Sequence, residues 1–282
     1  MAPPYLPGIE IHHGVGDNAS MITEESRVNT PGGNLFFKRW RPAHHDAAPI
    51  VLFHDSLGCV ELWRAFPQRL AMETGREVIA YDRLGFGKSD PHPDVLENDF
   101  ITTEAHHGFS ALHEHLALSR FIAFGHSVGG GMGAACAAAF PGQCVALITE
   151  AAQAFVEPRT REGVLAARKI FADEKQQDRL RRYHGEKAEW VLNAWIDTWL
   201  SEAFRDWSLE PTLREIRCPV LAMHGDRDEY GSVRHPECIA ALVQGPASRR
   251  IIQGCGHVPH REKENEVLQA VTEFLSSPAV GA

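Results

Sequence analysis

The chain has 282 residues, of which 44% are hydrophobic, and its formal net charge at pH 7 is −9. A chain of this length buries about three quarters of its unfolded surface, which is enough for one large core. The negative charge argues against nucleic acid and against an anionic membrane as partners, because both bind basic surfaces. We therefore expect one globular domain that carries an insertion.

The N-terminal segment, residues 1–24, is rich in Pro, Gly and His and is expected to form an extended arm. It has neither a basic start nor an apolar core, so we expect no secretory signal. The chain contains no run of about 18 apolar residues, which argues against a spanning helix. Six scattered cysteines without a CxxC pair predict reduced thiols and a cytoplasmic location.

Short apolar runs alternate with helical segments along most of the chain. A turn at residues 31–33 precedes one arm of a predicted hairpin at 34–40. The predicted buried strands lie at 49–55, 77–83, 120–126, 144–150, 218–226 and 248–257. The predicted helices lie at 63–74, 101–118, 127–140, 235–244 and 263–276. This alternation predicts an α/β fold with a mostly parallel sheet and helices on both of its faces.

The alternation stops between the fourth and fifth buried strands. Residues 151–211 carry no strand signal but show apolar side chains at helical spacing and four of the six tryptophans. We expect these tryptophans to anchor the insertion to the core or to line a pocket. The predicted divisions are an arm at 1–24, a first core part at 25–150, a helical cap at 151–211 and a second core part at 212–282.

Ser127 lies in a Gly125-x-Ser127-x-Gly129 pattern directly between a predicted strand and a predicted helix. This strand–turn–helix context is typical of a nucleophile elbow, in which flanking glycines permit a strained turn. The helix that follows offers free N–H groups beside the serine, and these groups stabilise negative charge. We therefore predict that Ser127 is a nucleophile, which requires a general base.

The expected base is His257, on a loop after the last strand and flanked by glycines. His260 follows Pro259 and is expected to have a structural or capping role. Both histidines come late in the chain, after the serine, as this arrangement requires.

The acid that orients the base is expected after the preceding strand, in the loop containing Asp226, Asp228 and Glu229. Asp228 lies deeper in the loop and is the predicted acid. Asp226 is expected to fix the turn by bonding the backbone. Glu150, at the end of the fourth strand, is a weaker candidate.

The chain also contains 16 histidines, which raises the question of a metal site. Several of them are adjacent pairs whose side chains point apart in a regular element. No HExxH spacing occurs. We expect no metal and no cofactor, and most histidines are expected at the surface.

Taken together, these segments resemble the α/β hydrolases, in particular the lidded serine esterases and lactonases. The resemblance extends over residues 33–275 and rests on five segments in order, "FHDSLG", "YDRLGFGKSD", "FGHSVGG", "LAMHGDRDEYGS" and "GCGHVPHRE". It implies a triad of Ser127, Asp228 and His257. It also implies an oxyanion hole made by the N–H groups of Ser56 and Val128.

Asp55 is the clearest departure from the family pattern, because glycine is usual at its position. A carboxylate aimed at the oxyanion hole repels the charge that develops there. We therefore expect Asp55 to point away from the hole and to bond its own loop.

A serine at the nucleophile position separates this chain from family branches that use aspartate there. The resemblance implies hydrolysis of a small carboxylic ester or lactone, with a pocket roofed by the cap residues Trp190, Trp195 and Trp199. Arginines of the cap are expected on a solvated face, and a carboxylate clamp is the alternative.

Other functions stay open at this point. The same triad serves C–C bond hydrolysis, acyl transfer and perhydrolysis, and relatives of the fold include ligand-binding proteins without turnover and cofactor-independent oxygenases. The expected partner is a small-molecule substrate, with neither nucleic acid nor a membrane, and a homodimer stays open.

Overall fold

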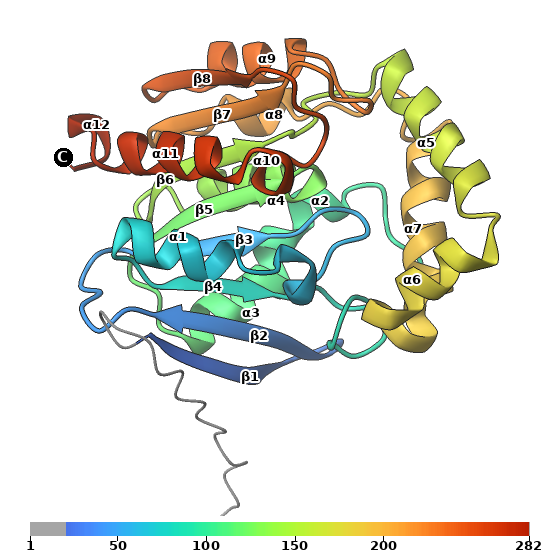
Figure 1. The fold of residues 1–282 in the computed structure, drawn as a ribbon, viewed down its shortest axis with the longest axis horizontal. Coiled ribbons are helices and arrows are strands. Elements are labelled where there is room, and N and C mark those ends of the chain that lie inside the picture. Colours follow the sequence, from blue (N-terminus) through green and yellow to red (C-terminus); the bar gives the residue numbers. More distant parts are fainter. Residues whose placement is uncertain (1–20, 282) are drawn as a thin grey trace, which may run out of the picture.

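The computed structural model describes residues 21–281, which form one eight-stranded sheet covered on both faces by helices (Figure 1). The strand order is β1-β2-β4-β3-β5-β6-β7-β8. The strands are β1 (Ile22–Thr30), β2 (Gly33–Arg41), β3 (Ile50–Phe53), β4 (Val78–Tyr81), β5 (Phe121–His126), β6 (Cys144–Glu150), β7 (Val220–Gly225) and β8 (Ala247–Ile252). Strands β3 to β8 are parallel, whereas β1 and β2 form an antiparallel hairpin. The predicted fold class is confirmed.

The sheet begins earlier than the sequence indicates. Strand β1 starts at Ile22, inside the segment predicted as an arm, because it pairs along its whole length with β2. Residues 1–20 of the predicted arm lie outside the described residues.

The central strands are apolar throughout because both faces of the sheet are covered. All four residues of β3 and all four of β4 are buried. One face packs on α1 (Phe66–Thr74), α10 (Pro259–Glu262), α11 (Glu264–Leu275) and α12 (Pro278–Gly281). The other face packs on α2 (Phe100–Thr103), α3 (Gly108–His115), α4 (Val128–Ala139), α8 (Glu210–Leu213) and α9 (Arg234–Leu242).

The segment predicted as a single helix at 101–118 is divided. Between α2 and α3 lies the short 3₁₀ helix η2 (Glu104–His106), and His107 takes φ −116° and ψ −97°. The Glu104 carboxylate accepts a 2.6 Å hydrogen bond from the Tyr81 hydroxyl. It also occupies the space beside Gly108, where a Cβ would lie 2.4 Å from Glu104 Oε1. The chain bends around this carboxylate, which hydropathy alone does not reveal.

The helices between β6 and α8 lie across the carboxyl ends of the parallel strands (Figure 1). They are α5 (Pro158–Ile170), α6 (Glu174–His184), the 3₁₀ helix η3 (Gly185–Lys187) and α7 (Ala188–Leu200). Several of their apolar side chains, among them Val191, Ile196 and Trp199, are buried. This layer therefore faces the edge of the sheet where residues that follow the strands gather. None of the helices within residues 21–281 has the length and apolarity needed to cross a membrane.

Candidate active site

Ser127 lies at a strained turn between β5 and α4. Its backbone has φ 56° and ψ −124°, a conformation that costs a residue with a Cβ about 1–3 kcal/mol. A Cβ on Gly125 would lie 2.0 Å from the carbonyl oxygen of Gly129. A Cβ on Gly129 would in turn lie 2.1 Å from the carbonyl oxygen of Phe53. Only glycine fits at both positions, and the turn formed there has the geometry of a nucleophile elbow.

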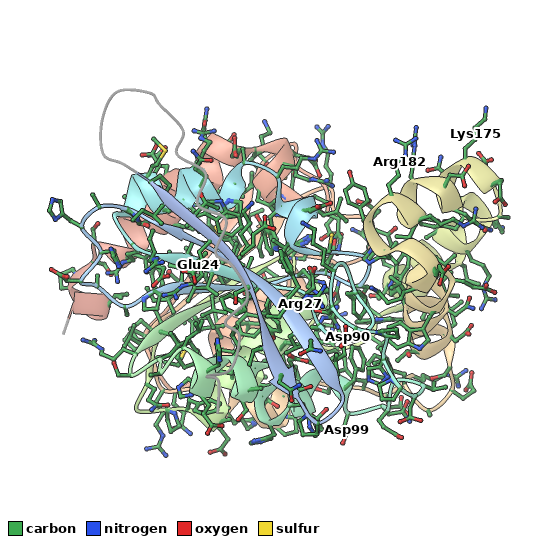
Figure 2. The ribbon with its side chains drawn as sticks, turned by 90° about the horizontal axis from the view of Figure 1, so that it is seen from below. Glu24, Arg27, Asp90, Asp99, Lys175 and Arg182 are labelled. Carbon is green, nitrogen blue, oxygen red and sulfur yellow. The ribbon has the colours of Figure 1, made fainter. Side chains whose placement is uncertain are left out.

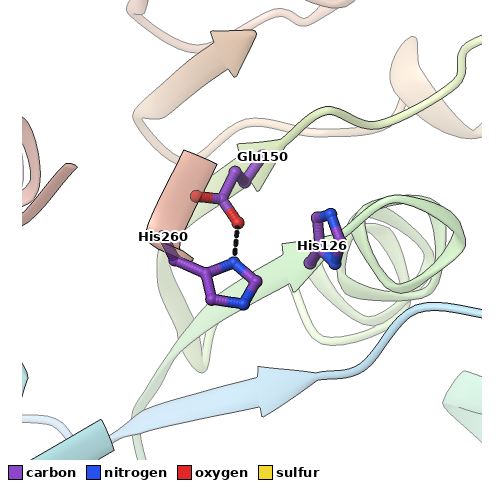
Figure 3. A group of neighbouring side chains, drawn as sticks. All are labelled: His126, Glu150 and His260. Atoms are coloured by element: carbon purple, nitrogen blue, oxygen red, sulfur yellow. Dashed lines mark hydrogen bonds and ion pairs between the residues drawn. The ribbon is translucent and has the colours of Figure 1, made fainter. Parts of the chain in front are cut away.

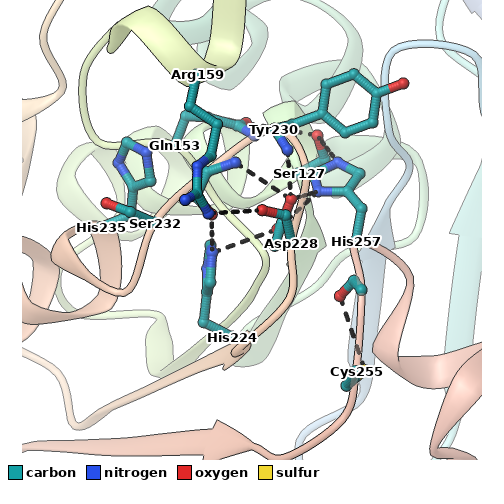
Figure 4. Close-up of polar contacts among 12 residues, drawn as sticks. Ser127, Gln153, Arg159, His224, Asp228, Tyr230, Ser232, His235, Cys255 and His257 are labelled. Atoms are coloured by element: carbon teal, nitrogen blue, oxygen red, sulfur yellow. Dashed lines mark hydrogen bonds and ion pairs between the residues drawn. The ribbon is translucent and has the colours of Figure 1, made fainter. Parts of the chain in front are cut away.

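His257 lies between Ser127 and Asp228 (Figure 4). Its Nε2 is 3.0 Å from Ser127 Oγ, and its Nδ1 is 2.8 Å from Asp228 Oδ2. Asp228 is 1% exposed, and its Oδ1 accepts hydrogen bonds from the backbone N–H groups of Tyr230 and Gly231. The structure thus brings together three residues that are far apart in the sequence and that the sequence singled out.

The charge of Asp228 sets the direction of these hydrogen bonds. Burial raises the pKa of Asp228, but the neighbouring His257 and the hydrogen bonds to the carboxylate outweigh burial, so the pKa lies below its ordinary value. An ionised carboxylate only accepts hydrogen bonds. The hydrogen of His257 is therefore assigned to Nδ1, and Nε2 accepts from the Ser127 hydroxyl.

The alternative acids and bases make other contacts. Asp226 Oδ1 accepts a 3.2 Å hydrogen bond from the backbone of Cys255 and so ties two loops together. Glu229 is exposed at the mouth of the cavity beside Ser127. Glu150 is bonded to His260, with 2.5 Å between Oε2 and Nδ1. In the described part of the chain, none of these four side chains is hydrogen-bonded to the Ser127 hydroxyl.

A cavity of about 230 Å³ opens above Ser127. Trp195 and Trp199 of α7 line it, together with Tyr230 and Val258. Trp190 does not line it, which corrects the expectation that all three tryptophans do. Trp190 lies five residues before Trp195, about 140° around the helix.

Trp190 instead packs against the loop that follows β4. Its ring stands edge-on to Phe86, and its Nε1 donates a 3.1 Å hydrogen bond to the carbonyl oxygen of Asp94. A Cβ on Gly85 would lie 2.2 Å from the same ring. Trp190 therefore anchors the helical layer to the core.

Gln153 is a neighbour of Ser127 that the sequence did not single out. It is 4% exposed, it lines the cavity, and its Oε1 lies 3.4 Å from Ser127 Oγ. The side-chain amide can present either its oxygen or its nitrogen to the serine. Its place just after β6 was the only signal available, because a glutamine in a loop has no distinctive pattern.

The backbone N–H groups of Ser56 and Val128 have no acceptor among the described residues. Ser56 lines the same cavity as Ser127, and Val128 begins the helix that follows it. Both groups are thus available to a substrate oxygen, as expected of an oxyanion hole.

Asp55 does not bond its own loop, which corrects that expectation. Its Oδ1 has no hydrogen-bond partner among the described residues and packs against Gly58. Its Oδ2 lies 3.5 Å from Nδ1 of His126, and the side chain is 31% exposed. Asp55 therefore faces a buried histidine on β5, while part of it still lines the cavity.

The histidines are also less exposed than expected. Within residues 21–281, only four are exposed, His44, His106, His107 and His115. Six are buried, His54, His126, His184, His224, His235 and His260. Each of these six has a hydrogen-bond or ion-pair partner, which makes its burial tolerable.

Three of the buried side chains, His126, Glu150 and His260, hold their donor atoms within 4.8 Å of one another (Figure 3). Two ligands of one tetrahedral zinc ion stand about 3.3 Å apart, given metal–ligand bonds near 2.0 Å. The 2.5 Å between His260 and Glu150 is shorter and is a hydrogen-bond distance. The geometry is that of a buried acid–histidine pair rather than of a preformed metal site.

The cap arginines contact backbone carbonyls, neighbouring carboxylates or solvent, and none of them lines the cavity. Arg159 Nη1 donates a 3.1 Å hydrogen bond to the carbonyl oxygen of Asp228. Arg161 donates to carbonyls at the end of α7, where a cation stabilises the helix C-terminus. Arg181 and Arg182 are exposed, and Figure 2 shows Arg182 pointing away from the core.

Comparison with known proteins assigns the chain to a family. The family model described as alpha/beta hydrolase fold matches residues 48–213, which is more than half of the chain. The chain belongs to the α/β hydrolase fold family. The predicted resemblance is confirmed at this level.

Among curated members of the α/β hydrolase fold family, the chain is 27% identical to the bifunctional esterase/perhydrolase DCH of Acinetobacter calcoaceticus. That match covers 70% of this chain and 80% of the relative. The chain is also 33% identical to the sn-1-specific diacylglycerol lipase ABHD11 of Danio rerio, over only 30% of this chain and 25% of the relative. The crystal structure of a membrane phospholipase A is similar with a TM-score of 0.71, 24% identity and coverage of 90% of this chain and 86% of the other. The similarity to the phospholipase structure shows the fold. The family match and the esterase relative identify the chain as a hydrolase.

Proposed function

We propose that this protein is a serine hydrolase that cleaves a small carboxylic ester or lactone through an acyl-enzyme on Ser127. One observation carries the proposal. Ser127 Oγ, the His257 imidazole and the Asp228 carboxylate form a continuous hydrogen-bonded chain, with Ser127 held at a strained elbow. A ligand-binding protein without turnover has no need for this arrangement.

In the proposed mechanism, Ser127 Oγ bonds to the substrate carbonyl carbon while His257 Nε2 takes the hydroxyl proton. The N–H groups of Ser56 and Val128 stabilise the oxyanion, each by about 3–4 kcal/mol. Asp228 stabilises the imidazolium that forms. Collapse of the intermediate breaks the bond to the alcohol, which takes the proton from His257. Water then attacks the acyl-enzyme while His257 takes a proton from it. Collapse of the second intermediate breaks the bond to Ser127 Oγ, which takes that proton from His257, and the acid leaves.

The cavity supports a small and uncharged substrate. Its volume of about 230 Å³ is modest, and the indole rings of Trp195 and Trp199 form part of its wall. The Acinetobacter relative, which aligns with most of the chain, is named an esterase as well as a perhydrolase. C–C bond hydrolysis, acyl transfer and perhydrolysis use the same triad, and substrate trials separate them from ester cleavage.

Labelling with a fluorophosphonate tests the proposal, because this reagent reacts with activated serines whatever the natural substrate. We expect one adduct, located by mass spectrometry on Ser127, and no adduct in the Ser127→Ala and His257→Ala variants. A folded wild-type protein that remains unlabelled would contradict a serine nucleophile and would favour the ligand-binding or oxygenase functions.

The charge around the cavity leads to a prediction about substrate choice. The described lining includes the carboxylates of Asp55 and Glu229 but no lysine or arginine. We expect kcat/KM for ethyl butyrate to exceed that for monoethyl succinate by about tenfold or more, because the second ester carries an additional carboxylate. Acid release measured at constant pH gives both values. Glu229→Gln should bring the two kcat/KM values closer together. A kcat/KM for monoethyl succinate equal to or above that for ethyl butyrate would refute the prediction.

A further inference from the structure

His126 stands between the loop that carries Ser56 and the loop that carries His257. It occupies the variable position just before Ser127, and its side chain is 2% exposed. Its Nε2 lies 2.7 Å from the backbone carbonyl oxygen of His257, and its Nδ1 lies 3.5 Å from Asp55 Oδ2. A carbonyl oxygen only accepts, so Nε2 carries a hydrogen. Nδ1 faces a carboxylate, which favours a second hydrogen there.

The charges around His126 favour its protonated form. Burial lowers the pKa of His126. The contact with the Asp55 carboxylate and the charge of Glu150 outweigh burial and raise the pKa to about 9. Burial raises the pKa of Asp55, but the contact with His126 outweighs it, so that the pKa of Asp55 is lowered. These two shifts describe an imidazolium paired with a carboxylate.

The other groups that face His126 do not replace it as the cation. Arg261 and His54 line the same small cavity as His126 and Asp55, but among the described residues only His126 lies within ion-pair distance of the Asp55 carboxylate. His260, on α10, has a pKa lowered chiefly by burial and donates to Glu150 on β6. The His257 ring lies 5.2 Å from His126, centroid to centroid, and hydrogen-bonds with Ser127 and Asp228. The indole of Trp63, on the 3₁₀ helix η1 (Val60–Trp63), also packs against the ring of His126.

Asp55 needs such a cation because of where it lies. It directly precedes Ser56, whose N–H group is proposed to bind the oxyanion, and it lines the same cavity as Ser127. An unpaired carboxylate at this place opposes the negative charge that develops on the substrate oxygen. His126 lies within ion-pair distance of this carboxylate.

We propose that His126 is a positioning residue that stays protonated as the counter-ion of Asp55 and ties the oxyanion loop to the loop of the base. The inference rests on the proposed serine hydrolase function. Because the oxyanion forms only in the transition state, loss of the pair acts on kcat and leaves KM nearly unchanged.

A double-mutant cycle tests the inference. His126→Gln can keep a donor for the His257 carbonyl but removes the positive charge beside Asp55. We expect it to lower kcat for ethyl butyrate about 10- to 100-fold, and we expect Asp55→Asn added to it to restore most of that loss. A structural role of His126 alone predicts no such rescue.

A matched control is the second buried acid–histidine pair, His235 with Glu157, whose His235 Nε2 and Glu157 Oε1 lie 3.1 Å apart. His235→Gln and Asp55→Asn should act additively, because their side chains make no contact with each other. Thermal unfolding of every variant shows whether the fold is kept. Additive effects of His126→Gln and Asp55→Asn in folded proteins would overturn the inference.

The pH dependence of kcat tests the inference even if the His126→Gln variant does not fold. A histidine with a raised pKa keeps its ion pair below its ordinary pKa and loses it as pH rises through the folded-state value. We therefore expect kcat of the wild type to fall as pH rises through about 9, and we expect Asp55→Asn to lack this fall. The same fall in Asp55→Asn would overturn the inference. A wild type that neither cleaves esters nor labels at Ser127 overturns the proposed function as well.

Discussion

Replacing Ser127 with alanine is expected to lower kcat by about 10⁴- to 10⁶-fold and to leave the protein folded. The hydroxyl contacts only His257 and Gln153 among the described residues, so its loss removes little stabilising contact. Alanine, like serine, carries a Cβ, so the backbone at φ 56° is no more strained than before. Steady-state kinetics on ethyl butyrate and denaturant unfolding measure the two effects.

The control for this prediction is His257→Ala, alone and combined with Ser127→Ala. Residues that act as one unit give effects that do not add, so the double variant should be about as slow as either single variant. Turnover by purified Ser127→Ala at a rate near that of the wild type would refute the nucleophile assignment.

Replacing Asp228 with asparagine is expected to lower kcat by about 10⁴-fold. The amide oxygen can still accept from Tyr230 and Gly231, which places the NH₂ group where Oδ2 faces His257 Nδ1. An amide donor there favours the tautomer with the hydrogen of His257 on Nε2, which cannot accept the proton of Ser127. The amide oxygen, which replaces an Oδ1 lying 2.9 Å from Nδ1, is neutral and holds the Nδ1 hydrogen less strongly than the carboxylate does. The triad keeps its shape but holds the wrong tautomer.

Asp226→Asn is the matched control, because Asp226 lies in the same loop and its Oδ1 accepts from the Cys255 backbone, a bond that asparagine retains. We expect this variant to keep most of its activity. Kinetics of the two variants side by side distinguish the orienting acid from a neighbouring carboxylate. A larger loss in Asp226→Asn than in Asp228→Asn would reverse the assignment.

Much of the fold could be predicted because it depends on local pattern. Buried parallel strands are apolar at every position, so β3 and β4 stand out from the flanking polar segments. The elbow could be predicted for a similar reason, since Gly125 and Gly129 are required by contacts within a few residues of Ser127 and with the neighbouring strand β3. The split between α2 and α3 could not be predicted, because it depends on the Tyr81–Glu104 contact.

The surroundings of the triad could not be predicted from sequence patterns. Gln153 reaches Ser127 only because β6 lies beside β5 in the sheet. Trp190 and Trp195 belong to one helix and look alike in sequence, yet only Trp195 lines the cavity. The direction in which a side chain points depends on how its helix sits over the core, which spacing within the helix does not determine.

By itself the sequence determined the α/β class, the elbow at Ser127 and the late positions of Asp228 and His257, because glycine requirements and buried-strand patterns are local. The tertiary structure alone decided what surrounds these residues. It turned Asp55 toward His126, and it buried six histidines in a chain whose histidines were expected mostly at the surface. Such pairings join residues about 70 positions apart or more, as in Asp55–His126 and Glu150–His260, and their energies depend on burial and distance. Both quantities exist only once the sheet has formed.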